Sequence, residues 1–103
     1  MSSWQPTHDE AVLTRQETQK PPMYRVLLHN DDFTTQQFVI MILQEIFHHS
    51  HADAMNIMLA VHNKGIGIAG VYTREVAETK IDKVHSLAAD NNFPLRCSMQ
   101  PDG

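Results

Sequence analysis

The polar residues with the clearest chemical potential are a short run, Asn30-Asp31-Asp32, and a single histidine, His62. Amide and carboxylate oxygens accept hydrogen bonds, and a neutral imidazole accepts one at its unprotonated nitrogen. The same residues also have a purely structural interpretation. Asn-Asp runs commonly form the turn that precedes a helix, and a histidine on an apolar helix is commonly a hydrogen-bonded core residue. Composition alone leaves both interpretations open.

Other reactive residue types lack the neighbours that their chemistry needs. His48, His49 and His51 straddle an expected helix break and have no carboxylate or cysteine at ligand spacing, so we predict no metal site. Cys97 is the single cysteine, which excludes an internal disulfide and a cysteine-based zinc cluster. It also has no evident histidine partner. No phosphate-cradling Gly-Lys loop or Gly-x-Ser-x-Gly elbow is present, and we predict no cofactor.

An enzyme hypothesis rests on the run Asn30-Asp31-Asp32-Phe33-Thr34, which faintly resembles the Asp-x-Asp-x-Thr start of haloacid-dehalogenase-like phosphatases. The nucleophilic carboxylate of such an enzyme would have to come from position 30, which is Asn. No later cluster of carboxylates marks a Mg²⁺ site. We therefore expect a protein that is not an enzyme.

Composition limits the remaining function classes. The chain of 103 residues has the size of one domain, and its formal net charge is −4. The eight Lys and Arg residues are scattered, which argues against a nucleic-acid partner, because phosphate neutralisation needs clustered basic residues. No apolar run approaches the roughly 20 residues that span a bilayer, and the N-terminus has no signal-peptide core. We expect a cytoplasmic, monomeric protein with no membrane partner.

Hydrophobic patterning predicts how the chain is organised. Residues 1–22 are polar and show no apolar period, so we expect a flexible N-terminal tail before a core domain at 23–100. In the core, alternation predicts strands and a spacing of three or four predicts helices. The expected elements are a strand at 23–29, a helix ending near 48, a helix at 52–63, a strand at 65–72, a helix from 74 to about 90 and a strand at 95–99, with 100–103 frayed. This order, β-α-α-β-α-β, predicts an α+β fold.

The helix starts carry their own signals. Thr34 or Thr35, then Ser50 and Thr73, are suitable N-cap residues because their hydroxyls accept from a backbone N–H in the first turn. The helix at 52–63 has hardly any polar face, so we expect it to be the most buried of the three.

Four stretches of the chain form a specific set: PMYRVLLHNDDFT (22–34), MLAVH (58–62), GVYTREVAETK (70–80) and FPL (93–95). Together they resemble the signature segments of the ClpS family, the adaptors of the ClpAP protease in the bacterial N-degron pathway. The resemblance covers residues 21–99 in order. It implies a three-stranded antiparallel sheet packed against three helices, similar to the C-terminal domain of a ribosomal stalk protein.

The resemblance also implies a binding site. Family members capture the free N-terminus of proteins that begin with a large apolar residue, typically Leu, Phe, Tyr or Trp. A protonated α-amine offers three donors, and the family positions that grip it match Asn30, Asp31 and His62. Asp32 and Thr34 would lie at the rim, near the backbone of the substrate's second residue. The apolar walls for the first side chain would be Leu28, Val39, Met58, Val61 and Leu95.

One position departs from the family pattern. Many members have Met two residues after the threonine that matches Thr34, where it narrows the pocket against β-branched side chains. This chain has Gln36 there. Rejection of Ile and Val therefore depends on a side chain of similar length and greater polarity.

The expected partners follow from the same resemblance. The core domain would dock on the N-terminal domain of a ClpA-type unfoldase, while the tail at 1–22 reaches toward the pore. Glu78, Thr79 and Lys80 lie in a family-like segment on the exposed side of the last helix, although a charged run is commonly just a solvated face. The alternative is a ribosomal-stalk-like interaction module without a degron pocket.

Overall fold

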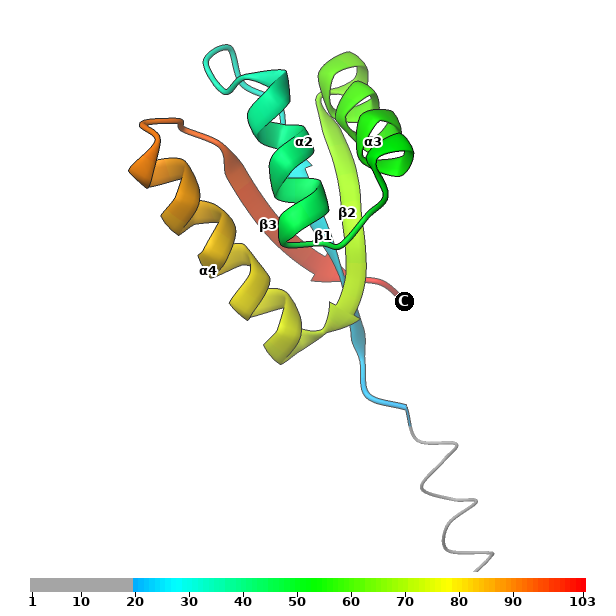
Figure 1. The fold of residues 1–103 in the computed structure, drawn as a ribbon. Coiled ribbons are helices and arrows are strands. Elements are labelled where there is room, and N and C mark those ends of the chain that lie inside the picture. The colour runs from blue at the N-terminus through cyan, green and yellow to red at the C-terminus, as the bar shows by residue number, and fades with distance from the viewer. Residues whose placement is uncertain (1–19) are drawn as a thin grey trace, which may run out of the picture.

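The computed structural model describes residues 20–103, which form three strands and three helices (Figure 1). None of the helices in this part of the chain is long and apolar enough to cross a membrane. The order β-α-α-β-α-β and the α+β class are confirmed. In chain order the elements are β1 (Met23–His29), α2 (Gln36–Glu45), α3 (His51–Lys64), β2 (Ile66–Thr73), α4 (Arg74–Asp90) and β3 (Arg96–Pro101).

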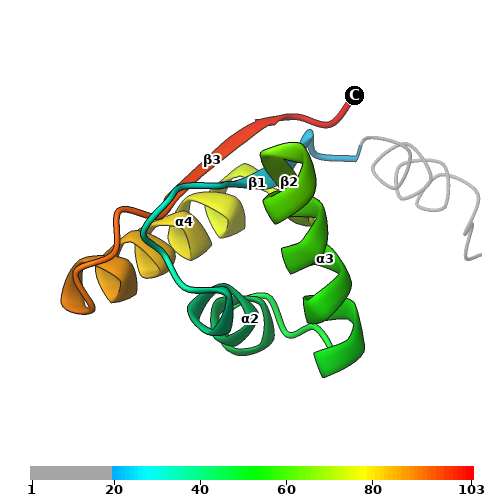
Figure 2. The same ribbon diagram turned by 90° about the horizontal axis from the view of Figure 1, so that it is seen from above.

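The sheet is antiparallel with the strand order β2-β1-β3, so the first strand is central. Its pairing with β2 shifts register between Val26, which pairs with Gly70, and Leu27, which pairs with Ile68. Ala69 is the extra residue of this bulge, and its side chain is fully buried. All three helices cover one face of the sheet (Figure 2).

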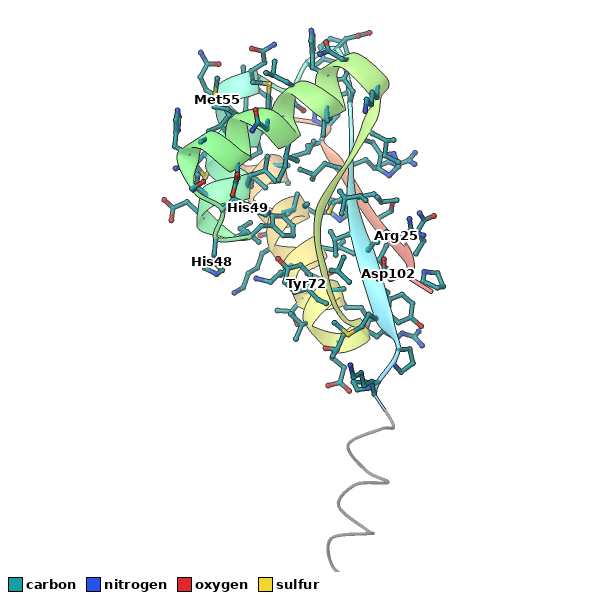
Figure 3. All side chains as sticks on the ribbon, turned by 90° about the vertical axis from the view of Figure 1, so that its right-hand side faces the viewer. Arg25, His48, His49, Met55, Tyr72 and Asp102 are labelled. Carbon is teal, nitrogen blue, oxygen red and sulfur yellow. The ribbon has the colours of Figure 1, made fainter. Side chains whose placement is uncertain are left out.

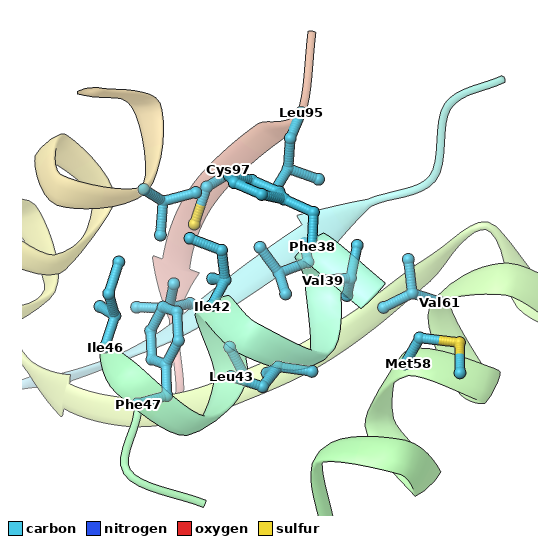
Figure 4. Packing of buried hydrophobic residues seen from close by; sticks show 14 of the residues in the cluster. Phe38, Val39, Ile42, Leu43, Ile46, Phe47, Met58, Val61, Leu95 and Cys97 are labelled. Carbon is cyan, nitrogen blue, oxygen red and sulfur yellow. The ribbon is translucent and has the colours of Figure 1, made fainter. Parts of the chain in front are cut away.

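Helix α2 supplies the centre of the core. Its N-cap is Thr35, whose Oγ1 accepts from the backbone N–H of Phe38 at 3.1 Å. The Phe38 ring packs on Phe93 with the ring centroids 4.9 Å apart, which ties the helix to the segment before β3. Figure 4 shows the buried residues of this helix and of the turn that follows, which are Phe38, Val39, Ile42, Leu43, Ile46 and Phe47.

The expectation that the second helix would be the most buried is wrong. Only Ala54, Met58 and Val61 of α3 are buried, and Leu59 remains 43% exposed. The reason is position: α2 lies between the other two helices in Figure 1, whereas α3 lies at the side of this layer, next to β2. A helix at the side of a layer buries only one narrow stripe, however apolar its sequence is.

The starts of α3 and α4 differ in whether the expected N-cap residue makes a capping hydrogen bond. Ser50 caps α3 as expected, because its Oγ accepts from the N–H of Asp53 at 3.1 Å. Thr73 occupies the N-cap position of α4, but its side chain makes no capping hydrogen bond.

The C-terminal residues are ordered further than expected. The prediction of fraying from residue 100 is wrong, because Gln100 pairs with Arg25 and β3 continues to Pro101. Asp102 then donates its N–H to the Met23 carbonyl at 2.9 Å. Its carboxylate lies 3.3 Å from Arg25 Nε, beside the same end of β1 (Figure 3). Polar composition favours fraying, but the hydrogen-bonded pairing with the central strand keeps this segment ordered.

Candidate functional site

The β1–α2 loop, the start of α2 and the end of α3 enclose a cavity of about 490 Å³. The loop and the start of α2 are contiguous, whereas the end of α3 lies more than 15 residues further along the chain, and they meet at one end of the helical layer. The residues that line the cavity are Asn30, Asp31, Asp32, Phe33, Thr34, Thr35, Gln36, Gln37, Val39, Met58, Val61 and His62.

The loop after β1 is held in shape by the carboxylate of Asp31. Its Oδ1 accepts from the backbone N–H groups of Phe33 at 2.8 Å and Thr34 at 2.7 Å, and its Oδ2 accepts from Thr34 Oγ1 at 2.7 Å. A side chain that bonds the backbone two and three residues ahead replaces a backbone turn. Asp31 therefore has a structural role besides any contact with a ligand.

The hydrogen bonds of Asp31 also set its charge state. Partial burial opposes ionisation, but the bonds from Thr34 and Phe33 outweigh it, and the pKa of the Asp31 carboxyl is lowered. The neighbouring carboxylate of Asp32 is exposed and accepts no hydrogen bond from any residue at 20–103. The rim of the cavity thus carries negative charge that favours a cationic group.

The end of α3 is fixed against this loop by two glycines. Gly65 ends the helix with a φ of 87°, and its carbonyl accepts from the N–H of Asn30 at 2.9 Å. At Gly67 a Cβ atom would lie 2.6 Å from Val61 Cγ2, so only glycine allows α3 and β2 to approach this closely. Together they bring His62 to the same cavity as Asn30.

The three residues expected to contact an amine, Asn30, Asp31 and His62, all line this one cavity. Asn30 and His62 are exposed and Asp31 is half-buried, so their polar atoms are open to a ligand. A carboxylate has about four acceptor positions, and the loop occupies three of those on Asp31. The trio can therefore offer an amide oxygen, a remaining carboxylate position and an imidazole nitrogen.

The apolar residues expected as pocket walls fall into two groups. Val39, Met58 and Val61 line the cavity, and they are at most 7% exposed. Leu28 and Leu95 are buried in the same core cluster, but they are not among the residues that line the cavity. Figure 4 shows Leu95 near Phe38. A role for Leu28 and Leu95 as pocket walls stays a prediction.

The rim contains both expected and unexpected residues. Asp32, Thr34 and Gln36 line the cavity as predicted, although the Thr34 hydroxyl already donates to Asp31. Sequence reasoning missed Phe33, Thr35 and Gln37, which line it too. The signal for Phe33 was available, since it is an apolar residue in a polar turn and lies outside the apolar stripe of α2.

The histidines of the α2–α3 turn do not form a second site. The Nε2 atom of His49 lies 2.5 Å from the Ala69 carbonyl, which joins this turn to the bulge in β2. Among residues 20–103, no group of three or more His, Cys, Asp and Glu side chains is placed to hold a metal ion.

Comparison with known proteins identifies the family of this chain. A family model described as "ATP-dependent Clp protease adaptor protein ClpS" matches residues 19–98. This chain belongs to the ClpS family. ClpS proteins are adaptors, so the phosphatase-like interpretation of the Asn30-Asp31-Asp32 run is excluded and the chain is not an enzyme.

Close ClpS relatives cover most of the chain. The ClpS of Myxococcus xanthus is 54% identical in an alignment of 99 residues that covers 92% of this chain and 92% of the relative. The ClpS of Desulfatibacillum aliphaticivorans is 59% identical in an alignment of 93 residues that covers 88% of this chain and 89% of the relative.

A solved ClpS structure has the same fold. The structure of Agrobacterium tumefaciens ClpS2 bound to L-phenylalaninamide superposes with a TM-score of 0.77 at 32% identity. The match covers 81% of this chain and all of that one. Fold and family therefore agree along the part of the chain that contains the cavity.

Proposed function

We propose that this adaptor binds the free N-terminus of proteins that begin with Leu, Phe, Tyr or Trp. It then delivers them to the N-terminal domain of a ClpA-type unfoldase for degradation by ClpP. The observation that carries the proposal is a single cavity in which Asn30, Asp31 and His62 adjoin the apolar side chains of Val39, Met58 and Val61. An N-terminal residue with a large side chain has the matching pair of groups, an ammonium and an apolar body.

The polar part of the cavity suits an α-amine. A protonated amine has three N–H donors and no acceptor, so only acceptors satisfy it. Asn30, Asp31 and His62 supply acceptors, and the carboxylates of Asp31 and Asp32 compensate the positive charge. An acetylated N-terminus has lost the charge and two of these donors. The site should therefore discriminate strongly against it.

The apolar part suits a large first side chain. Burying a Leu or Phe side chain contributes about 1.5 to 3 kcal/mol. Met58 is unbranched and polarisable, which allows the same wall to pack against a flat ring or a branched aliphatic group. The compound bound to the Agrobacterium protein, L-phenylalaninamide, combines a free α-amine with a phenyl ring. That chemistry supports the same use of the cavity here.

Delivery requires more than the cavity. The tail at 1–22 lies almost wholly outside the described residues, and we propose that it engages the unfoldase during hand-over. Deleting it should leave peptide affinity unchanged and slow degradation by the ClpA-type enzyme. Normal degradation of an N-degron substrate by the truncated adaptor would contradict this role.

One residue of the charged segment on α4 that was expected to be exposed is partly buried. Glu78 and Thr79 are exposed, but Lys80 is half-buried, and its ammonium donates to the Ile46 carbonyl at 2.7 Å. The same ammonium lies 5.0 Å from the centroid of the Tyr72 ring. Lys80 thus stabilises the end of α2, whatever it contacts in a partner.

The proposed function is tested by fluorescence anisotropy with labelled peptides that differ only in their first residue. Peptides that begin with Leu, Phe, Tyr or Trp should bind with a Kd of about 1 μM or lower, which corresponds to roughly −8 kcal/mol. Peptides that begin with Gly or with acetylated Phe should bind far more weakly. Equal binding of free and acetylated Phe, or no binding of any free N-terminus, would favour the alternative of a stalk-like interaction module.

A further inference from the structure

Phe33 is an exposed aromatic residue at the mouth of the cavity. Its side chain is 74% exposed, whereas the next most exposed large hydrophobic side chain among residues 20–103, Ile68, is 46% exposed. Phe33 does not belong to the hydrophobic core, and it lines the cavity. The phenyl ring therefore has little to contribute to folding.

The backbone beneath this ring is held without help from the ring. The N–H of Phe33 donates to Asp31 Oδ1 at 2.8 Å, and the N–H of the next residue, Thr34, donates to the same atom at 2.7 Å. The loop is also attached to the end of α3 by the bond from Asn30 to Gly65. The ring thus extends from a preorganised backbone, so that stacking on it costs little ordering of the loop.

A peptide bound in the proposed way has to leave the cavity across a rim that includes Phe33. If the amine lies at Asn30 and His62 and the first side chain packs on Met58, the remaining chain must leave through the open rim. The rim residues are polar or charged except for Phe33. The ring is therefore the apolar surface at the mouth that a second side chain can meet.

We propose that Phe33 is a specificity-determining residue that binds the side chain of the substrate's second residue. It selects aromatic and large aliphatic side chains over Gly and Ser. The inference rests on the proposed function, since it assigns a second subsite to the same cavity. Aromatic stacking and packing on an exposed ring predict a preference of about three- to tenfold in Kd.

The experiment uses the full chain and peptides with uncharged side chains that share Phe as the first residue and differ only at the second, which is Gly, Ser, Leu or Tyr. Because all four peptides carry the same charge, the carboxylate of Asp32 does not distinguish between them by charge. Anisotropy is measured for the wild type, Phe33→Ala, Phe33→Tyr and a control, Ile68→Ala. Ile68 is an exposed apolar residue of β2 that does not line the cavity.

The wild type should bind the Leu and Tyr peptides about three- to tenfold more tightly than the Gly peptide. In Phe33→Ala this preference should disappear, so that the Leu and Tyr peptides bind no more tightly than the Gly peptide. Phe33→Tyr should retain the preference because it keeps the ring, and the Ile68→Ala control should behave as the wild type does.

Two results would overturn this inference and leave the proposed function intact. One is equal binding of all four peptides by the wild type, and the other is a uniform loss of affinity in Phe33→Ala, which would show that the ring supports the site as a whole. In both cases free Phe N-termini still bind, so the proposed function survives. If no free Phe peptide binds the wild type, the proposed function fails and this inference fails with it.

Discussion

Thr34 and Asp31 are joined by two hydrogen bonds at the mouth of the cavity. The Thr34 hydroxyl donates to Oδ2 of Asp31 at 2.7 Å, and the Thr34 backbone N–H donates to Oδ1 at 2.7 Å. Hydrogen bonds to an ionised carboxylate favour its charged form and fix its orientation. The Asp31 carboxylate that lines the cavity is therefore the same group that shapes the loop.

Replacing Thr34 by Val should raise the pKa of Asp31 toward its ordinary value of 3.8, because one of the bonds that lower it is lost. A lowered folded-state pKa contributes stability that is fully present above pH 3.8 and is lost as the pH falls through the lowered value. Thr34→Val should thus lower the free energy of unfolding by about 1 kcal/mol at neutral pH. The variant should also lose less of this free energy than the wild type when the pH is lowered.

This prediction is checked by NMR titration of the Asp31 carboxyl carbon and by urea unfolding at neutral and acidic pH. Thr79→Val is the matched control, since the Thr79 hydroxyl donates to the Glu75 carbonyl on the exposed face of α4, away from Asp31. An unchanged Asp31 titration in Thr34→Val would show that the hydroxyl does not perturb the carboxylate.

Asp31 and Asp32 should respond differently to removal of the carboxylate. Asp31→Ala removes three hydrogen bonds and should lower both peptide affinity and the free energy of unfolding, the latter by about 1 to 3 kcal/mol. Asp32 is exposed, so Asp32→Ala should leave stability within about 0.5 kcal/mol and weaken binding through lost charge compensation. Denaturant unfolding and anisotropy on the same samples test this. Equal stability loss in both variants would remove the structural role of Asp31.

Gln36 should control access of β-branched first residues. It is the first residue of α2, and its exposed side chain lines the cavity. Gln36→Ala should widen the mouth and so raise the affinity for Ile and Val peptides relative to that for the Leu peptide. Gln36→Met should lower this relative affinity. Differences of one methyl group in a pocket amount to about tenfold or more. Competition with unlabelled Leu, Ile and Val peptides measures the affinity for Ile and Val relative to Leu. If this ratio is identical in the wild type, Gln36→Ala and Gln36→Met, Gln36 does not control access to the pocket.

Binding should weaken in acid through His62. Protonation converts the acceptor nitrogen of its ring into a donor that would face the cationic amine, so the protonated ring should bind the peptide more weakly than the neutral ring. Anisotropy between about pH 8 and 5 records the profile. His62→Gln keeps an acceptor and should flatten it, whereas the exposed control His51→Gln should not. A wild-type profile that is already flat would remove His62 from the amine site.

Local signals in the chain determined the types of the elements and most of their boundaries. Thr35 and Ser50 cap helices as expected, because a hydroxyl bond to the first turn depends only on neighbouring residues. Alternation and helical periodicity likewise report which face of an element is apolar. The same reasoning failed for α3, since the number of apolar residues in a helix does not say how many neighbours it has.

Only the tertiary structure decided how the candidate site is assembled. Asn30 and His62 line one cavity because the Gly65 carbonyl accepts from the N–H of Asn30 beside the paired strands β1 and β2, and because Gly67 lets α3 approach the sheet. The sequence by itself identified a set of acceptors and a set of apolar residues. The acceptors share one cavity with Val39, Met58 and Val61, whereas Leu28 and Leu95 do not line it. This arrangement follows from strand register and helix packing, which depend on contacts between distant segments.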